Sequence, residues 1–282
     1  MEVNTWRYDY SKQREFTWFL ASDLHLKNPD CDETRIKNDL TEAHDKKSRI
    51  LLNGDIFDMI LPSDLKRYTA GRDNINADAA MNVAVDYAVK FLTPWVDDID
   101  MIGVGNHETA PIKFCSADPV LFLLRDLNHI RSNKLQPIAH GGYTGFIRLC
   151  FAFGKSGRDK AIDVWYNHGQ GGSSEVTRGA IDLTRRQYIR SDIIWLGHKH
   201  KRMAMDLDYE IGLTQKGIPY EKEKRGVVTG CYLKNYGESG TNNGYRLNYA
   251  EQRMRTPQAR GGAWLTIKLQ SSYAEPVIRI TV

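Results

Sequence analysis

Residues 99–108 have the sequence IDMIGVGNHE, in which a short apolar run ends abruptly in polar residues. The run at 99–104 is too short for a typical helix and carries isoleucine and valine, which favours a buried β-strand. The residues at 105–108 include an amide, an imidazole and a carboxylate, all of which can take part in metal or acid–base chemistry. This stretch therefore predicts a strand that delivers reactive side chains to its carboxyl end.

The same pattern occurs four more times along the chain. The runs are FTWFLA before Asp23-Leu24-His25, RILLN before Gly54-Asp55-Ile56-Phe57-Asp58, AIDVWY before Asn167-His168-Gly169, and DIIWL before Gly197-His198-Lys199-His200. Helices are predicted between them, at roughly 33–46, 77–91 and 119–127. Strands that alternate with helices predict an α/β fold, in which ligands bind beyond the carboxyl ends of the strands. The sequence therefore directs all five motifs to one place.

The last part of the chain has a different pattern. Residues 226–233, 263–269 and 276–282 are predicted strands without long helices between them, and we expect residues 203–282 to complete a second sheet. No repeat or clear linker interrupts the chain, which predicts one domain over 1–282 with its motifs at about 16–202. Residues 241–262 form a basic segment with interleaved tyrosines.

Composition limits the function classes. The chain has 282 residues and a net charge of +4, from 39 basic and 35 acidic residues, which suits an anionic substrate and permits nucleic acid. No apolar run approaches the ~20 residues that cross a bilayer, and the polar amino end is unlike a secretory signal. The four cysteines are few and widely scattered and form no CxxC pair, so we expect reduced thiols and a cytoplasmic protein. No membrane partner is expected. The cysteines are Cys31, Cys115, Cys150 and Cys231.

The polar residues at the strand ends form a set of potential metal ligands. They are Asp23, His25, Asp55, Asn106, His168, His198 and His200. Oxygen and neutral imidazole together suit Mn²⁺, our first choice, or Fe²⁺ or Zn²⁺, whereas Mg²⁺ and Ca²⁺ prefer oxygen alone. Seven ligands exceed what one such ion binds, but they suit two ions about 3.5–4 Å apart that share a carboxylate. The sequence therefore predicts a centre with two divalent ions.

The ordered motifs D-x-H, G-D-x-x-D, G-N-H-E, H and G-H-x-H resemble those of the calcineurin-like metallophosphoesterase superfamily. The resemblance spans roughly residues 16–202, and the one departure is Glu108, where the family more often has aspartate. It implies a four-layer α/β/β/α sandwich with two mixed sheets. It also implies that Asp23, His25, Asp55 and His200 hold one metal, and that Asp55, Asn106, His168 and His198 hold the other.

The resemblance assigns further roles around this centre. Asp55 would bridge the metals, and a water or hydroxide between them would be the nucleophile. His107 would protonate the leaving oxygen or stabilise the transition state. Asp58 and Glu108 would orient the ligands and their loops. The implied activity is hydrolysis of a phosphate ester.

The substrate is less well defined by the sequence. The first hypothesis is a phosphodiesterase or nuclease, supported by the positive balance and by Arg246, Arg253 and Arg255, with Lys199 as a further candidate contact. The alternative is a phosphomonoesterase acting on a nucleotide, a phosphoprotein or a small metabolite. An inactive binding module is disfavoured because no ligand position is lost. The glycine-rich run at 169–174 either cradles phosphate or merely lets His168 approach the metal. Nothing in the sequence indicates an oligomeric state.

Overall fold

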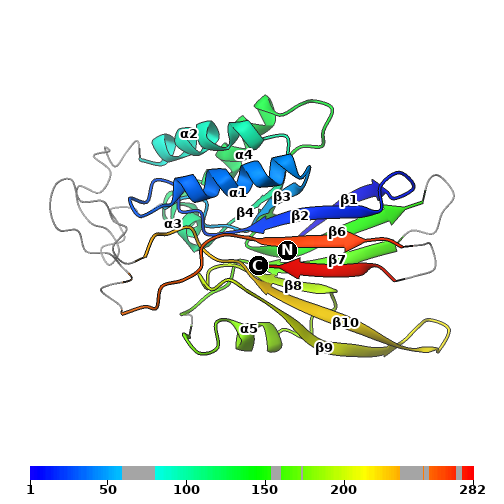
Figure 1. The fold of residues 1–282 in the computed structure, drawn as a ribbon. Coiled ribbons are helices and arrows are strands. Elements are labelled where there is room, and N and C mark those ends of the chain that lie inside the picture. The colour runs from blue at the N-terminus through cyan, green and yellow to red at the C-terminus, as the bar shows by residue number, and fades with distance from the viewer. Residues whose placement is uncertain (59–79, 154–159, 173, 236–249, 251–253, 271–274) are drawn as a thin grey trace.

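The computed structural model describes residues 1–58, 80–153, 160–172, 174–235, 250, 254–270 and 275–282. Within these residues the chain forms two six-stranded mixed sheets that pack face to face, with helices on their outer sides (Figure 1). Three buried apolar clusters separate the layers: one beneath the helices, one between the sheets, and one beneath a short helix on the far side. The predicted four-layer α/β/β/α sandwich with two mixed sheets is confirmed.

The first sheet carries three of the five motifs. Its order is β12-β11-β2-β3-β4-β5, and β2 to β5 run parallel. The antiparallel strands β11 and β12 extend the sheet beside β2. The strands are β2 (Glu15–Ala21), β3 (Arg49–Leu52), β4 (Ile99–Gly103), β5 (Ala139–Gly142), β11 (Ala263–Lys268) and β12 (Val277–Thr281).

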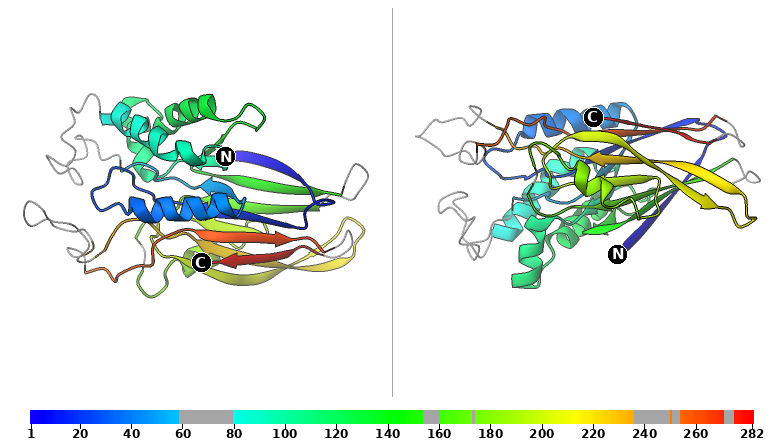
Figure 2. Two further views of the ribbon diagram at one scale, coloured as in Figure 1. Left: turned by 45° about the horizontal axis from the view of Figure 1, so that its top comes forward. Right: turned by 90° about the horizontal axis from the view of Figure 1, so that it is seen from below.

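The second sheet carries the other two motifs. Its order is β1-β6-β7-β8-β10-β9, in which β7, β8 and β10 run parallel to one another. The strands are β1 (Glu2–Asp9), β6 (Thr144–Ala152), β7 (Lys160–Asn167), β8 (Ile193–Leu196), β9 (Met203–Leu213) and β10 (Pro219–Val228). Trp18 of the first sheet and Trp195 of the second are almost completely buried in the core between the sheets. Figure 2 shows the two sheets from two further sides.

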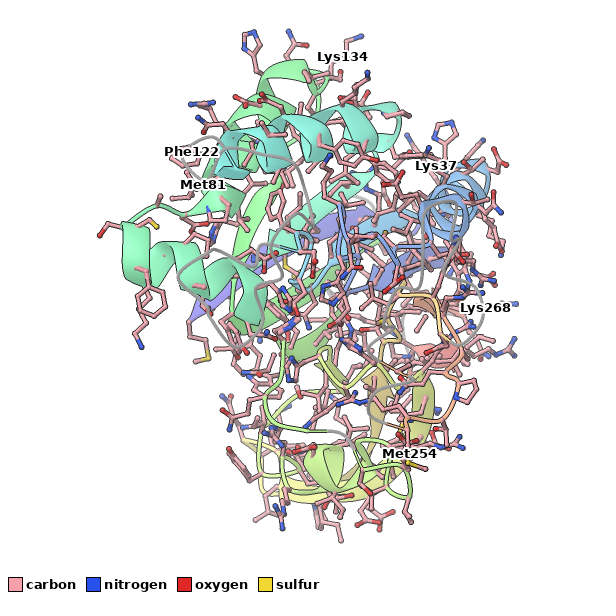
Figure 3. All side chains as sticks on the ribbon, turned by 90° about the vertical axis from the view of Figure 1, so that its left-hand side faces the viewer. Lys37, Met81, Phe122, Lys134, Met254 and Lys268 are labelled. Atoms are coloured by element: carbon pink, nitrogen blue, oxygen red, sulfur yellow. The ribbon has the colours of Figure 1, made fainter. Side chains whose placement is uncertain are left out.

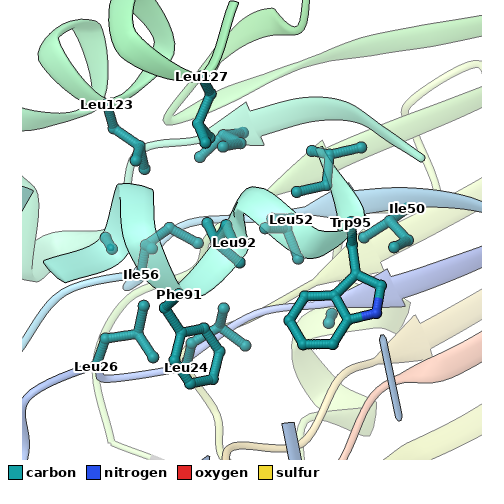
Figure 4. Packing of buried hydrophobic residues seen from close by; sticks show 14 of the residues in the cluster. Leu24, Leu26, Ile50, Leu52, Ile56, Phe91, Leu92, Trp95, Leu123 and Leu127 are labelled. Atoms are coloured by element: carbon teal, nitrogen blue, oxygen red, sulfur yellow. The ribbon is translucent and has the colours of Figure 1, made fainter. Parts of the chain in front are cut away.

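The helices cover the outer faces. The helices α1 (Glu33–Asp45), α2 (Ala80–Leu92) and α4 (Pro119–Ile130) lie on the first sheet, and a turn of 3₁₀ helix follows α2 at Thr93–Trp95. Figure 4 shows how Leu92 and Trp95 pack against Leu52 and Ile50 of β3. The short helix α5 (Ala180–Thr184) covers the second sheet through Leu183. Burial of this apolar surface is the main stabilising term of such an architecture.

Side-chain caps fix where the helices begin. The carboxylate of Asp32 accepts the backbone N–H of Arg35 at the start of α1, at 3.1 Å. The carboxylate of Asp118 accepts the N–H of Val120 at 2.9 Å, and Pro119 occupies the first turn of α4. These are the residue types that satisfy the orphan donors of a helix start.

The end of the chain departs from our expectation. Residues 203–282 do not all complete the second sheet, because β9 and β10 join that sheet whereas β11 and β12 extend the first beside β2. The predicted strand at 226–233 ends at Val228. Isolated strand patterns show burial but not pairing partners, so the sequence could not distinguish the two edges.

The helix predictions need smaller corrections. The helix predicted at 77–91 is seen from Ala80 to Leu92, and residues 77–79 lie outside the described part. A helix that we did not predict, α3 (Asn106–Cys115), begins at the G-N-H-E motif and contains Pro111. Its pattern was masked by that proline and by weak amphipathic character. The one-domain organisation remains a prediction.

A cavity of about 410 Å³ lies on the helical side of the molecule. Met81 of α2 and Phe122 of α4, both labelled in Figure 3, are among its lining residues. None of the seven predicted ligand residues lines it. The cavity is therefore separate from the predicted ligands.

Candidate metal centre

The five motifs meet where the parallel strands of both sheets end, at the left of Figure 1 and facing the viewer in Figure 3. The loop after β2 carries the first motif and the loop after β3 carries the second. The third begins α3 directly after β4, and the fourth and fifth follow β7 and β8. Parallel strands in adjacent layers thus bring together residues that lie up to 177 positions apart, from Asp23 to His200.

The first group of ligand atoms comprises Asp23, His25 and His200. Nε2 of His200 lies 3.3 Å from Oδ1 of Asp23, and Nε2 of His25 lies 4.0 Å from the same oxygen. Asp23 is fully buried, and its other oxygen, Oδ2, accepts the backbone N–H of His198 at 2.9 Å. The carboxylate is thereby fixed with Oδ1 facing the imidazoles.

The second group comprises Asp55, His168 and His198. Nε2 of His168 lies 3.1 Å from Oδ2 of Asp55. The same oxygen lies 4.0 Å from Nε2 of His25 in the first group. The other oxygen of Asp55 accepts the N–H of His107 at 2.9 Å, at the start of α3, where the helix dipole favours an anion. Asp55 therefore lies between the two groups.

Hydrogen bonds fix which ring nitrogen each histidine presents. Nδ1 of His168 contacts the carbonyl of Asn53 at 2.7 Å, which requires a proton there and leaves the Nε2 lone pair for a metal. Nε2 of His198 contacts the carbonyl of Gly171 at 3.0 Å, which leaves Nδ1 for a metal. The two rings thus face the centre through opposite nitrogens.

The donor atoms fit divalent ions. Within the described residues, several buried side-chain atoms at the centre have no hydrogen-bond partner: Oδ1 of Asp23, Nε2 of His25, Oδ1 of Asn106, Nε2 of His168 and Nδ1 of His198. Such a buried atom costs roughly 1–3 kcal/mol when it has no partner, so its clustering requires an explanation. Oxygen and neutral imidazole are donors for Mn²⁺, Fe²⁺ or Zn²⁺. The side chains present at this site therefore fit the predicted divalent metal ions.

Backbone strain is concentrated in the same loops. The φ angles of five predicted ligand residues lie between 49° and 64°, in the left-handed region: Asp23, His25, Asp55, His198 and His200. This conformation costs about 1–2 kcal/mol for a residue other than glycine. Strained backbone of this kind is common at functional sites.

Two glycines allow the loops after β3 and β4 to approach. A Cβ atom on Gly54, whose φ is +76°, would lie 2.5 Å from the backbone N of Gly105. A Cβ atom on Gly105 would overlap the carboxylate of Asp55. Only glycine fits where two backbones come this close. The glycines of both motifs are therefore required by the position of Asp55.

Glu108 joins the same two loops. Its Oε2 accepts the backbone N–H groups of Asp55 at 3.0 Å and Gly105 at 2.7 Å, and its Oε1 accepts that of Phe57 at 3.0 Å. Its side chain is fully buried. Burial, together with the charge of Asp55, raises the pKa of Glu108 to about 7. Glu108 thus joins the loop after β3 to the loop after β4 through three backbone hydrogen bonds.

Glu108→Ala is expected to lower the free energy of unfolding by on the order of 3–6 kcal/mol, because three buried N–H groups lose their acceptor. Glu108→Gln keeps one acceptor oxygen, which can still serve two of the three donors, and is expected to lose only part of this. Urea denaturation with a chelator present measures both without a contribution from bound metal. An alanine variant as stable as the native protein would contradict the role.

Asp58 lies between two histidines. Its Oδ1 is 3.6 Å from Nδ1 of His25 and 3.6 Å from Nδ1 of His107. The rings of His25 and His107 are 4.7 Å apart and meet edge to face. His107 also forms a possible third ligand group with His25 and Asp55. The predicted division between His107 and the ligands therefore needs an experiment.

The charges of the centre support one another. Burial opposes ionisation of the aspartates, but neighbouring histidines lower the pKa of Asp23 to about 2 and hold the pKa of Asp55 well below its ordinary value. Burial likewise opposes a charge on His168, but Asp55 raises its pKa to about 9. Without metal, protonated imidazole thus supplies positive charge to this pair of carboxylates.

The structure describes two of the four predicted substrate contacts, Lys199 and Arg255. Arg246 and Arg253 lie outside the described residues. The ammonium of Lys199 is buried, and it donates to the carbonyl of Gln170 at 2.7 Å and contacts Asp182 at 2.9 Å. Arg255 is half-buried, and its backbone N–H donates to the carbonyl of Ala250 at 3.0 Å. The described contacts of Lys199 are thus with the loop after His168 and with Asp182 of α5.

Two residues at the centre were missed. The hydroxyl of Tyr143 donates to the carbonyl of Gly169, and its ring lies 5.6 Å from that of His168. Burial and the nearby carboxylates raise the pKa of Tyr143 to about 12. The hydroxyl of Ser22 contacts the carboxylate of Asp23. Tyr143 follows the glycine pair at 141–142, a signal too weak to identify it.

Comparisons with known proteins give structural matches alone. No family model matches the chain, and no curated protein matches it. A predicted phosphoesterase from Streptococcus pneumoniae TIGR4 matches with 13% identity and a TM-score of 0.31, over 94% of this chain and 88% of that chain. The calcineurin-like phosphoesterase YfkN from Bacillus subtilis matches with 10% identity and a TM-score of 0.39, over 95% and 90%. A metallophosphoesterase from Sphaerobacter thermophilus matches with 11% identity and a TM-score of 0.33, over 95% and 89%.

Two mixed sheets lie between helices, and the five ordered motifs meet at one edge of them. This four-layer α/β/β/α sandwich brings the groups of potential metal ligands together at that edge. Among the described residues, no helix combines the length and apolar character needed to span a membrane.

Proposed function

We propose that this protein is a metal-dependent phosphoesterase with two divalent ions, and that phosphodiesters are its preferred substrates. One observation carries the proposal. Asp55 lies between two groups of donors, with the same oxygen 3.1 Å from His168 and 4.0 Å from His25. A shared carboxylate is what two closely spaced cations require, because an anion between them offsets their repulsion.

The residues of the chain divide the work around the ions. Asp23, His25, Asp55 and His200 would hold the first, and Asp55, Asn106, His168 and His198 the second, with Mn²⁺ as the first choice. When bound, the ions would supply Lewis-acid charge to the phosphate and activate the attacking water. The aspartates and imidazoles hold this charge in a buried place where it acts strongly.

His107 is proposed as the proton donor to the leaving oxygen. It stands in the first turn of α3, and its backbone N–H is fixed on Asp55 at 2.9 Å. Oδ1 of Asp58 lies 3.6 Å from Nδ1 of the ring, and its charge favours a proton on that nitrogen, which leaves Nε2 for the substrate. Proton donation matters most for esters with a poor leaving group.

The preference for diesters rests on charge. The net charge of +4 and the arginines of the basic segment suit a polyanion such as nucleic acid. Reaction at phosphorus does not itself distinguish diesters from monoesters, because the rest of the substrate is recognised by loops.

The test uses one Mn²⁺-loaded preparation on bis(p-nitrophenyl) phosphate, p-nitrophenyl phosphate, and single- and double-stranded DNA. Metal analysis of the same preparation should give about two equivalents. Faster hydrolysis of the diester supports the proposal. Activity confined to the monoester, with DNA left intact at low salt, would contradict the phosphodiesterase and indicate a phosphomonoesterase. If the protein bound no metal and hydrolysed none of these substrates, the proposed phosphoesterase activity would be wrong.

Metal binding is expected to release at least one proton at pH 7. The pKa of His168 is about 9 in the metal-free protein, so its imidazole is protonated at pH 7 and must become neutral to bind metal. Affinity should therefore rise, and proton release should shrink, as the pH approaches 9. Calorimetric titration with Mn²⁺ in two buffers of different ionisation enthalpy measures the release. The same heat in both buffers would show that no proton leaves.

A further inference from the structure

A buried chain of side-chain hydrogen bonds leads from the second sheet to the metal centre. The indole N–H of Trp195, in β8, donates at 3.2 Å to Oγ1 of Thr229, which directly follows β10. Oγ1 of Thr229 lies 2.7 Å from Oγ of Ser22, which follows β2 in the first sheet. The hydroxyl of Ser22 donates to Oδ2 of Asp23. All four residues are fully buried.

The donors of this chain all point toward Asp23. An indole nitrogen only donates, and a hydroxyl has a single proton to give. Because Ser22 gives its proton to the carboxylate, Thr229 must be the donor in the contact between the two hydroxyls. Oγ1 of Thr229 also lies 3.3 Å from the carbonyl oxygen of Leu196, but its contact with Ser22 is the shorter one. Hydrogen bonds that run in one direction polarise and strengthen one another.

The glycine of the fifth motif leaves room for this chain. A Cβ atom on Gly197 would lie 2.9 Å from Oγ and 3.0 Å from Cβ of Ser22. The φ angle of Gly197 is not positive, so its backbone conformation does not require glycine. The position of the Ser22 side chain therefore explains why the motif has glycine before its first histidine.

The chain determines which oxygen of Asp23 is available to a metal. Oδ2 accepts both the hydroxyl of Ser22 and the backbone N–H of His198, the latter at 2.9 Å. Oδ1 has no hydrogen-bond partner among the described residues, and it lies 3.3 Å from Nε2 of His200. Two donors on Oδ2 fix the rotation of the carboxylate, which leaves Oδ1 facing the histidines.

Resting on the proposed function, we propose that Ser22 and Thr229 are positioning residues for the first metal ion. Ser22 holds Asp23 directly, and Thr229 holds the hydroxyl of Ser22 in the direction that makes it a donor. Partners of this kind orient a metal ligand and tune its affinity without touching the metal. Because Thr229 belongs to the second sheet and Asp23 follows a strand of the first, the chain also ties the ligand to the packing of the two sheets.

The test measures Mn²⁺ binding by calorimetry on native and variant proteins that have been stripped with a chelator. Ser22→Ala removes the hydroxyl that donates to Asp23. It should weaken one of the two binding steps by on the order of 10–100-fold, the range for a lost partner of a metal ligand. The other step should change little, because Asp23 belongs to the ligand set proposed for the first ion alone. Thr229→Val keeps the shape of the side chain but not its hydroxyl, and should weaken the same step by a smaller factor.

Thr229→Ser is the matched control. It keeps the hydroxyl and loses a buried methyl group, so it should bind Mn²⁺ more nearly like the native protein than Thr229→Val does. A role in packing alone predicts no such rescue. Because each variant is judged by the difference between its two binding steps, a general loss of stability cancels.

Two results would overturn the positioning role. One is a Ser22→Ala variant whose two steps are both unchanged or are weakened equally, and the other is a Thr229→Ser variant that binds no better than Thr229→Val. If the native protein binds two ions and hydrolyses esters in either case, the proposed function stands. If the native protein binds no metal and hydrolyses no ester, both proposals fail.

Discussion

Asp55→Asn is expected to leave the protein with less than one equivalent of metal and to lower turnover by on the order of 10³-fold or more. The carboxylate lies between both ligand groups, and the amide of asparagine is neutral and offers one acceptor oxygen. Losing several kcal/mol of charge stabilisation at the reacting phosphate corresponds to about this factor, at 1.36 kcal/mol per tenfold.

Metal analysis after dialysis and steady-state rates on the diester test this expectation. Asp126→Asn is the matched control, because Asp126 is a carboxylate on the outer helix α4 that pairs with Arg125 at 2.7 Å. Exposed pairs of this kind contribute little to stability. Full metal content in Asp55→Asn would show that the two ions do not share this residue. The proposed bridging role of Asp55 would then be wrong.

His107→Ala is expected to retain both ions but to lose about 10²–10⁴-fold in rate, the range for a lost general acid. The backbone N–H that binds Asp55 is kept in this variant, so the carboxylate should stay in place. The loss should be larger for a phenyl ester than for a p-nitrophenyl ester, because the nitrophenolate leaves without protonation.

The comparison of two leaving groups separates this role from a structural one. A misplaced loop would slow both esters alike, whereas a missing proton donor slows the poorer leaving group more. The structure also groups His107 with His25 and Asp55 as potential ligands. If His107→Ala lost metal as well as rate, His107 would be a ligand and the division of roles proposed for this centre would be wrong.

The supporting contacts show why ligands alone do not make a centre. Glu108 holds the loops of Asp55 and Gly105 through three backbone N–H groups, and Asp58 lies 3.6 Å from both His25 and His107. Neither set of contacts could be predicted from motif spacing, because each joins motifs about 30 to 55 residues apart in the chain. The motifs identified Glu108 and Asp58 as supporting residues, but only the fold showed which groups they contact.

Several features were determined by the sequence itself. Short apolar runs that end in Asp, Asn or His predicted buried strands with polar carboxyl ends. The alternation of these strands with helices predicted an α/β fold. Both follow from local patterns of burial, which each segment carries independently of its neighbours. The identity of the seven candidate ligands followed in the same way, because strand ends in such a fold converge.

Tertiary structure alone decided the rest. The pairing of β11 with β2 and the ring nitrogens that His168 and His198 present depend on contacts between distant segments. A strand pattern specifies which face is buried but not which edge it joins, and a histidine in a sequence does not specify its tautomer. These properties arise only when packing brings specific donors and acceptors within hydrogen-bonding distance.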